Sequence, residues 1–326
     1  MIFGTRLSAM SDKLLKNLPR TMLAPMAGYT DYAFRHICRR YGVGLTVTEM
    51  ISAKALTMGS ELSFKMLHRA DGDKPCFCQI FGHEPEVLAE SVKFDGVAAY
   101  EGIDINMGCP VKKIVSNGDG SALLENPKLA AKCITAVKLA LGDKPLSVKF
   151  RLGVSDSDGA VDFAKTCRDS GADFITVHFR TRKQMYSGNA DFTLLPEIAK
   201  IGIPVFANGD VTTREQYEKL LNMGAYGVAI GRGALGRPYI FAELEGRAYE
   251  MDLYETVKLH ADMLSQLYSD RVVANELKKH VCCYLKGKRN AKNTIVAANT
   301  ASTVDEILNE VAAFIENNPQ YEKVQR

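Results

Sequence analysis

Eight short apolar runs constrain the fold of this chain more than any other feature, because each ends in glycine or a polar residue and precedes an amphipathic stretch. Apolar runs that alternate with helix-like segments are typical of strand–helix units. The runs occupy residues 21–28, 45–50, 75–82, 102–109, 146–153, 174–180, 204–210 and 227–233. Eight consecutive units predict a (β/α)8 barrel, the TIM barrel fold.

A doubly wound open sheet is the alternative α/β arrangement, and its first strand should lead into a GxGxxG loop. The first run here ends in PMAGYTD instead, which favours the barrel. The chain has 326 residues, enough for one large and one small domain. We therefore expect the barrel in residues 1–245 and a second domain in residues 246–326.

Charge, apolar runs and cysteine spacing limit the class of protein. The net charge is only +3, so no chain-wide basic field indicates a nucleic-acid partner, although a local patch is still compatible with one. No apolar run reaches the length of a membrane span, and residues 1–20 lack the uninterrupted apolar segment of an export signal. The eight cysteines show neither CxxC pairs nor zinc-ligand spacing. We expect a cytoplasmic protein with no membrane association and no metal ion.

The barrel prediction places the active site at the C-terminal ends of the strands. The polar residues expected there are Glu49, Gln79, Asn106, Cys109, Lys149, Arg151, His178, Arg180, Asn208, Asp210 and Arg232. Because successive side chains of a strand point to opposite faces, we expect Lys149 and Arg151 to face the barrel mouth and Val148 and Phe150 to face the surrounding helices. We find no carboxylate on the matching face of the neighbouring run, so an anionic ligand rather than a structural ion pair is expected to meet Lys149.

The last two runs end in ANGDVTT and AIGRGALGRP, which offer small residues and free backbone N–H groups where such barrels commonly bind phosphate. Arg232 adds a guanidinium suited to phosphate oxygens. A phosphate site beside a lysine and a glutamine predicts flavin mononucleotide, FMN, with its ring across the strand ends. Lys149 would neutralise the N1/O2 edge of the reduced ring, while Gln79 and Asn106 would hydrogen-bond to its polar edges.

Several stretches resemble the tRNA-dihydrouridine synthase family and follow the family's order along the barrel. They are APMAGYTDYAFR (24–35), TEMISAKAL (48–56), DINMGCPVKKI with NGDGSALLENP (104–127), SVKFRLG (147–153), TVHFRTR with YSG (176–188), ANGD (207–210) and AIGRGALGRPYIF (229–241). The segment ELKKHVCCYLKG (276–287) is similar to the family's C-terminal helical domain. Family members often have glycine after the histidine, where this chain has Phe179, and alternation predicts that Phe179 faces outward.

The resemblance implies a flavoenzyme that reduces the C5–C6 double bond of particular uridines in tRNA, with Cys109 as the general acid. The implied flavin contacts are Pro25, Met26 and Ala27 as the seat of the ring, Gln79, Lys149 and His178, and Asn208, Gly209, Asp210, Gly231 and Arg232 as the cradle of the ribityl phosphate. Asn106, Arg151 and Arg180 are expected on the substrate side.

A thiol suits the role implied for Cys109. Reduction of uracil needs a hydride at C6 from the reduced flavin and a proton at C5, where hydride addition leaves negative charge. A thiol with an ordinary pKa of about 8.5 is mostly protonated at neutral pH yet acidic enough to protonate that carbon. Serine is a far weaker acid, and an ordinary aspartic acid is already ionised. NADPH or NADH is expected to reduce the flavin again.

Basic residues are concentrated in residues 271–292. They are Arg271, Lys278, Lys279, Lys286, Lys288, Arg289 and Lys292, against the single acidic Glu276. Tyr284 lies among them as a candidate for base stacking. This patch predicts that the helical domain of residues 246–326 binds tRNA, with Lys286, Lys288 and Arg289 on phosphates. We expect the protein to be a monomer.

Two other functions remain possible on the sequence alone. A small-molecule flavin reductase of the dihydroorotate or enoate type would share the barrel and flavin but would not need the basic segment. A non-catalytic RNA-binding protein would need neither Cys109 nor Lys149. Bound flavin separates both enzymes from the binding protein, and reduction of free uridine compared with tRNA separates the two enzymes.

Overall fold

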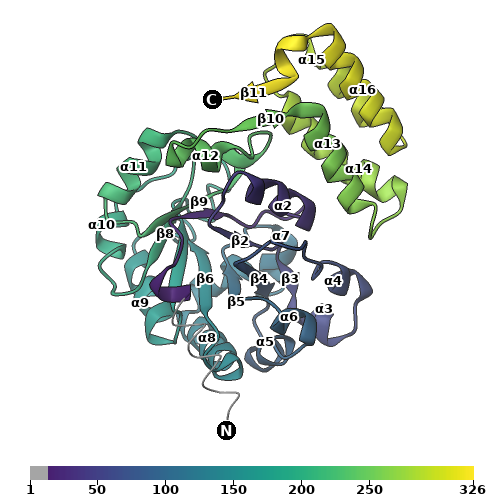
Figure 1. Ribbon diagram of the computed structural model, residues 1–326. Helices are drawn as coiled ribbons and strands as arrows, with labels where there is room; N and C mark the ends of the chain where they lie inside the picture. The colour runs from purple at the N-terminus through teal and green to yellow at the C-terminus, as the bar shows by residue number, and fades with distance from the viewer. Residues whose placement is uncertain (1–13) are drawn as a thin grey trace.

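The computed structural model describes residues 14–326, and Figure 1 shows a barrel of strands ringed by helices with a separate helical bundle formed by the C-terminal part of the chain. Residues 1–13 contributed to the expectation about export and lie outside the described residues.

The barrel wall consists of eight parallel strands. They are β1 (Thr21–Leu23), β2 (Leu45–Val47), β4 (Cys76–Phe81), β5 (Gly102–Met107), β6 (Leu146–Arg151), β7 (Phe174–His178), β8 (Val205–Asn208) and β9 (Gly227–Ile230). Their order is β2-β1-β9-β8-β7-β6-β5-β4, and pairing of β2 with β4 closes the sheet. Each strand lies within one of the eight apolar runs, so the predicted TIM barrel is confirmed. A two-residue strand, β3 (Ile51–Ser52), extends the rim beside β4.

Helices and turns alternate with the strands and cover the outside of the barrel. They are α2 (Tyr32–Arg40), α3 (Ala53–Thr57), α4 (Glu61–Lys65), α5 (Pro85–Ser91), α6 (Asp95–Ala98), α7 (Lys112–Ser116), η1 (Gly120–Glu125), α8 (Pro127–Leu141), α9 (Ala160–Asp169), α10 (Leu195–Ile198), α11 (Arg214–Asn222), η2 (Arg232–Ala234) and α12 (Ile240–Glu245). Local capping interactions begin two of them. Asp31 accepts hydrogen bonds from the first turn of α2, and Thr213 forms a capping box with Gln216 in α11.

Strand alternation fills the lower barrel with aromatic rings. Phe77, Phe174 and Phe206 are buried inside it, and successive ring centroids lie 5.4 and 5.5 Å apart. The next inward residues along these strands are polar, for example Gln79 and Asn208. The aromatic floor therefore supports a polar layer at the C-terminal ends of the strands.

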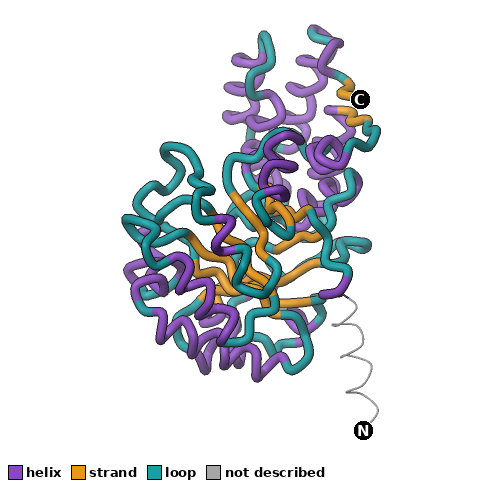
Figure 2. The backbone as a smooth tube through the Cα atoms, turned by 90° about the vertical axis from the view of Figure 1, so that its left-hand side faces the viewer, coloured by secondary structure: helices purple, strands orange, loops and turns teal. Residues whose placement is uncertain are grey.

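The C-terminal residues form a bundle with its own apolar core. Its elements are β10 (Glu250–Asp252), α13 (Leu253–Leu264), α14 (Asp270–Leu285), α15 (Ala291–Thr300), α16 (Val304–Asn317), η3 (Pro319–Tyr321) and β11 (Lys323–Gln325), and β10 pairs antiparallel with β11. Tyr32 and Ala33 of α2 belong to this core, so α2 joins the bundle to the barrel. Figure 2 shows the bundle standing to one side of the barrel. No helix in residues 14–326 is both long and apolar enough to cross a membrane.

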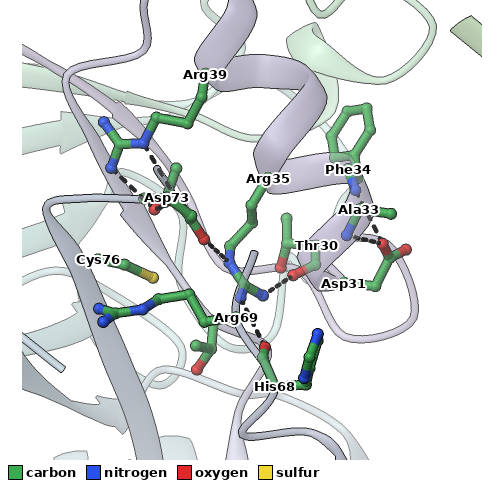
Figure 3. A network of polar contacts seen from close by, with 12 residues as sticks. Thr30, Asp31, Ala33, Phe34, Arg35, Arg39, His68, Arg69, Asp73 and Cys76 are labelled. Atoms are coloured by element: carbon green, nitrogen blue, oxygen red, sulfur yellow. Dashed lines mark hydrogen bonds and ion pairs between the residues drawn. The ribbon is translucent and has the colours of Figure 1, made fainter. Parts of the chain in front are cut away.

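A buried ionic network anchors the loop between β1 and α2 (Figure 3). The Nε atom of Arg35 lies 2.8 Å from Oδ2 of Asp73, and Thr46 donates to the same carboxylate. A second guanidinium nitrogen of Arg35 donates to the carbonyl of Thr30 at 2.9 Å. Since Asp73 is fully buried, its charge is compensated by arginine, and the loop that carries residues 25–27 is held in place.

Candidate active site

A chain of hydrogen bonds orients the amide groups on β4 and β5. Gln79 donates to Asp104 over 2.6 Å, and Asn106 donates to the side-chain oxygen of Gln79 over 3.0 Å. Ser147 of β6 donates to the other oxygen of Asp104. All four side chains are buried. The carboxylate therefore fixes which way each amide faces in the barrel mouth.

The side chain of Asn106 also shapes the loop that carries Cys109. Its carbonyl oxygen accepts hydrogen bonds from the backbone N–H groups of Gly108 and Cys109, at 3.1 and 2.9 Å. A Cβ atom at Gly108 would lie only 3.3 Å from the backbone of Phe150, which favours glycine there. On the far side, Ser121 donates to the carbonyl of Cys109.

The thiol of Cys109 is partly buried at this turn. Burial raises the pKa of Cys109, and this effect exceeds the lowering by Arg151 and Lys149. The thiol therefore retains its proton at neutral pH, which is the state that a proton donor needs.

Lys149 lies opposite Asn106 in the pairing of β5 with β6 and faces the barrel mouth. Burial, and then repulsion from Arg151, lower the pKa of Lys149 to about 8. Its ammonium group has no ion pair or hydrogen bond within residues 14–326.

The expectation that the neighbouring strand presents no carboxylate was wrong. Asp104 lies on the inward face of β5, two residues before Asn106, and its charge partly offsets the lowering of the pKa of Lys149. Asp104 is already hydrogen-bonded to Gln79 and Ser147, however, and burial raises its own pKa to about 6. It lies below Lys149 in the barrel rather than in contact with it, so the ammonium group remains available to a ligand.

His178 is buried at the end of β7 on the same inward surface. Burial, and then the charges of Lys149 and Arg151, strongly lower the pKa of His178. The ring is therefore neutral at physiological pH. Its Cδ2 atom lies 3.7 Å from the position that a Cβ atom on Gly209 would occupy, so β7 and β8 bring both residues together. Phe179 faces outward against Phe192, as alternation predicts.

A cluster of two arginines and an aspartate occupies the side of the mouth formed by β7, β8 and β9. Asp210 accepts from Arg180 through one oxygen and from Arg232 through the other, the latter at 3.0 Å. Arg180 is nearly fully buried, and one of its terminal nitrogens has no hydrogen-bond partner among the described residues. Arg232 is half exposed and forms its ion pair with Asp210 on the side of the mouth where the phosphate is predicted.

Gly231, at the end of β9, lies beside the β1 loop. A Cβ atom on Gly231 would lie 3.5 Å from the sulfur of Met26 and 4.0 Å from the side-chain nitrogen of Asn208. Asn208 itself donates to the carbonyl of Ala229 at 2.7 Å. The predicted seat at residues 25–27 and the predicted phosphate cradle therefore adjoin.

These features fit a flavin phosphate and ring. Lys149 keeps an ammonium group without an ion pair or hydrogen bond in residues 14–326, and Gly231 places no side chain between the end of β9 and the β1 loop. Gln79 and Asn106 are oriented hydrogen-bonding groups beside them. The predicted cofactor residues thus lie together in one surface, from β1 through β9.

The loop after β7 contacts Arg151, one of the residues predicted on the substrate side. Arg151 donates to the carbonyls of Gly108, Thr181 and Met185, at 2.8, 3.2 and 2.9 Å. Its guanidinium carbon lies 5.8 Å from the ring centroid of Tyr186, and that of Arg232 lies 5.2 Å away. Arg151 therefore joins the Cys109 turn to a loop with an exposed aromatic ring at its tip.

The basic residues predicted to bind tRNA lie along α14, in the turn that follows it and at the start of α15. Lys286 and Arg289 are exposed, and the ammonium group of Lys288 lies 4.6 Å from the ring centroid of Tyr321. Lys279, on the same helix, approaches the β1 loop: its ammonium nitrogen lies 3.4 Å from the position of a Cβ atom on Gly28. The basic surface therefore begins beside the barrel mouth.

The prediction that Tyr284 stacks on a base was wrong. Its side chain is buried in the bundle core, because α14 turns this position inward toward α2 and the other helices. Tyr186 and Tyr29 lie nearer the mouth, and Tyr29 has the ammonium group of Lys279 at 5.9 Å from its ring centroid.

Asp31, His260 and His280 form a cluster of metal-ligand type between α2, α13 and α14, with ligand atoms within 4.8 Å of one another. His260 and His280 approach the carboxylate through Nε2 at 3.2 and 3.5 Å. The Nδ1 atoms of both rings are buried without a partner. A metal-bound histidine normally donates its other N–H group to an acceptor, so we interpret the cluster as a polar connection between the domains, in which His260 is hydrogen-bonded to Asp31 and His280 lies beside it.

The sequence predicted Glu49 at the C-terminal ends of the strands without assigning it a role. Its carboxylate accepts from the backbone N–H of Gly28, and burial raises its pKa to about 7. Asp104 was missed altogether, although it has the same strand parity as Asn106 and alternation alone would have placed it inside the barrel.

The fold and the site define a (β/α)8-barrel enzyme whose mouth combines a protonated thiol, oriented amides and unpaired cations. The family model described as "Dihydrouridine synthase (Dus)" matches residues 22–318. The chain therefore belongs to the dihydrouridine synthase family, a family of flavin oxidoreductases.

Curated relatives support this assignment over nearly the whole chain. A protein of Rickettsia conorii named "Probable tRNA-dihydrouridine synthase" is 35% identical over 314 residues, covering 90% of this chain and 92% of the relative. The "tRNA-dihydrouridine synthase B" of Pseudomonas putida is 35% identical over 312 residues and covers 92% of each chain.

Solved structures support the fold at much lower identity. Morphinone reductase superposes with a TM-score of 0.53 at 11% identity, covering 73% of this chain and 88% of that protein. The old yellow enzyme of Trypanosoma cruzi gives a TM-score of 0.52 at 9% identity, covering 70% and 88%.

Proposed function

We propose that this protein reduces particular uridines of tRNA to 5,6-dihydrouridine, with FMN as cofactor and NADPH or NADH as the electron donor. The observation that carries the proposal is the pairing of β5 with β6, which sets the Cys109 turn beside the unpaired ammonium group of Lys149. A proton donor and a cation for a reduced ring are the two groups that this reaction requires.

In this proposal the flavin and Cys109 act on different carbons of the uracil ring. When bound, the reduced flavin supplies a hydride to C6 of the uracil. Cys109 donates its proton to C5, and Asn106 holds the Cys109 turn through two backbone hydrogen bonds. Because burial keeps the thiol protonated, the proton is present before the substrate arrives. Arg151 supports the same turn through the carbonyl of Gly108.

The cofactor would be held by groups from most of the barrel. Residues 25–27 would lie beneath the ring, and Gln79, Lys149 and His178 would contact its polar edges. A neutral His178 can donate one hydrogen bond and accept another. Asn208, Gly209, Asp210, Gly231 and Arg232 would surround the ribityl phosphate.

We further propose that residues 1–245 form the catalytic domain and that residues 246–326 bind tRNA. Extraction of a base from a stacked tRNA costs a few kcal/mol, which contacts to the backbone must offset. The cations Lys286, Lys288 and Arg289 on the bundle, of which Lys286 and Arg289 are exposed, together with Arg180 in the mouth, supply positive charge for that purpose.

Replacement of the thiol tests the proposal. We expect Cys109→Ala to retain its flavin and to accept hydride from NADPH at the parent rate, but to form dihydrouridine at least about 100-fold more slowly, because general acid catalysis is lost. Dihydrouridine in purified unmodified tRNA is the measurement. Cys282→Ala, which removes a partly buried thiol of the bundle, should behave as the parent protein. Unchanged dihydrouridine formation by Cys109→Ala would exclude the thiol as the acid.

A further inference from the structure

A cleft of about 620 Å³ lies at the rim of the barrel, next to the Cys109 loop but outside the site described above. Its walls come from the β3–α3 junction with Lys54, the end of β4 with His83, and α7 with Lys113 and Asn117. Since these segments follow the C-terminal ends of their strands, the cleft opens on the catalytic face of the barrel. Its volume suits a ligand of nucleotide size.

The cleft is connected to Cys109 through the segment after α7. His83 forms a 2.8 Å contact with Asp119, which lines the cleft, and Asp119 precedes Gly120. A Cβ atom on Gly120 would lie 2.9 Å from the carbonyl oxygen of Cys109, so this backbone packs directly against the cysteine. A ligand that contacts Asp119 would therefore touch the neighbour in sequence of Gly120, whose backbone packs against Cys109.

The lining combines features that suit a single nucleotide. Lys113 is exposed and has no ion pair within residues 14–326, so its charge is available to a phosphate. Ile114 and Val87 provide an apolar wall for the face of a base. Asn117 and Asp119 offer both donor and acceptor atoms, as needed at the hydrogen-bonding edge of an unstacked base.

We propose that this cleft binds a tRNA nucleotide adjacent to the reduced uridine, with its base between the apolar wall and Asn117 and its phosphate at Lys113. The inference rests on the proposed function. A uridine in the barrel mouth must be separated from its stacked neighbours, and a neighbour that is displaced with it needs a binding site of its own. The cleft then gives the enzyme a preference for the nucleotide beside its target.

Two neighbouring lysines of α7 provide a matched test. Lys113 lines the cleft, whereas Lys112 is also exposed and does not line it. We expect Lys113→Ala to raise the KM for tRNA about fivefold and to reduce the slope of log affinity against log salt by about 1, since one phosphate contact is lost. Lys112→Ala should leave both quantities unchanged. Equal effects of the two substitutions would overturn the proposal.

The base contact is tested with Asn117→Ala and two kinds of substrate, once the reduced position is mapped in the parent protein. One kind is intact tRNA. The other kind consists of two abasic tRNAs, each lacking the base on one side of the target uridine. We expect Asn117→Ala to raise the KM about tenfold for intact tRNA and to have no effect for one of the abasic tRNAs. An equal effect on all substrates would contradict a base contact.

Two further measurements separate this proposal from the proposed function. Flavin content and NADPH oxidation with molecular oxygen should be unchanged in Lys113→Ala and Asn117→Ala, because neither residue contacts the predicted cofactor site. A parent protein that forms no dihydrouridine would refute the proposed function itself. Saturable binding of uridine monophosphate in the cleft that intact tRNA does not displace would instead identify a free nucleotide as the occupant.

Discussion

At the scale of single residues, the ammonium group of Lys149 lies in the barrel mouth without an ion pair among the described residues. Lys149 is half-buried, and its pKa of about 8 shows that burial and Arg151 disfavour the ammonium form more than Asp104 favours it. The folded protein without flavin therefore binds this proton less tightly than the unfolded chain. Its stability should rise as the pH increases from about 8 to 10.5, where only the folded form has released the proton.

Lys149→Met tests whether the ammonium group of Lys149 lowers the stability of the flavin-free protein. We expect the flavin-free variant to be more stable than the flavin-free parent by about 2 kcal/mol at pH 7, after allowance for partial exposure, and to bind FMN more weakly. Chemical denaturation of both apoproteins measures the first effect, and titration with FMN measures the second. Lys165→Met, on the exposed side of α9, should change neither quantity. A variant that binds FMN as tightly as the parent would remove Lys149 from the cofactor site.

The sequence predicted most of the inward-facing residues, because strand parity depends on the chain alone. Gln79, Asn106, Lys149 and His178 all face the mouth as alternation requires. The hydrogen bonds among them depend on which strands are neighbours and on their register, which no single strand contains. For that reason Asp104 was overlooked as a partner of Gln79.

At the scale of secondary structure elements, one carboxylate joins three helices. Asp31 caps α2 through the N–H groups of Ala33 and Phe34 and also meets His260 of α13 and His280 of α14. Burial alone would raise the pKa of Asp31, but the two imidazoles outweigh it and hold that pKa well below its usual range. The cap is a local interaction between residues adjacent in the chain. The contact with the two histidines needs the tertiary packing of α2 on the bundle.

The cluster predicts how stability depends on pH. Burial lowers the pKa of His280 to about 4, so the unfolded chain binds a proton there before the folded protein does. The free energy of unfolding should therefore fall by about 3 kcal/mol as the pH decreases from about 6.5 to 4. Denaturant titrations across this range measure the loss. His280→Asn, which cannot titrate, should show a smaller decrease even if it is less stable at pH 7. Parallel pH profiles for variant and parent would contradict this role of His280.

At the scale of the whole molecule, positive charge is concentrated in one segment of the bundle. The chain carries a net charge of +3, whereas residues 271–292 contain seven basic residues and one acidic residue. The rest of the chain is slightly acidic, so residues 271–292 form a local cationic patch within the bundle. Composition predicted this asymmetry correctly, but the direction of each side chain comes from the packing of α14. Tyr284 faces the core for that reason, and Lys279 faces the β1 loop.

Neutralisation of the bundle surface tests whether this charge binds tRNA. We expect the triple variant Lys286→Ala, Lys288→Ala and Arg289→Ala to bind tRNA more weakly and to lower the salt slope by about 2 to 3, since each lost phosphate contact removes about 0.9. Flavin content should be unchanged, because all three residues lie on the bundle. Three exposed lysines of the barrel, replaced together as Lys132→Ala, Lys165→Ala and Lys200→Ala, form the control with the same change in net charge. If both triple variants lose the same salt slope, the effect comes from net charge, and the bundle surface is not the site of tRNA binding.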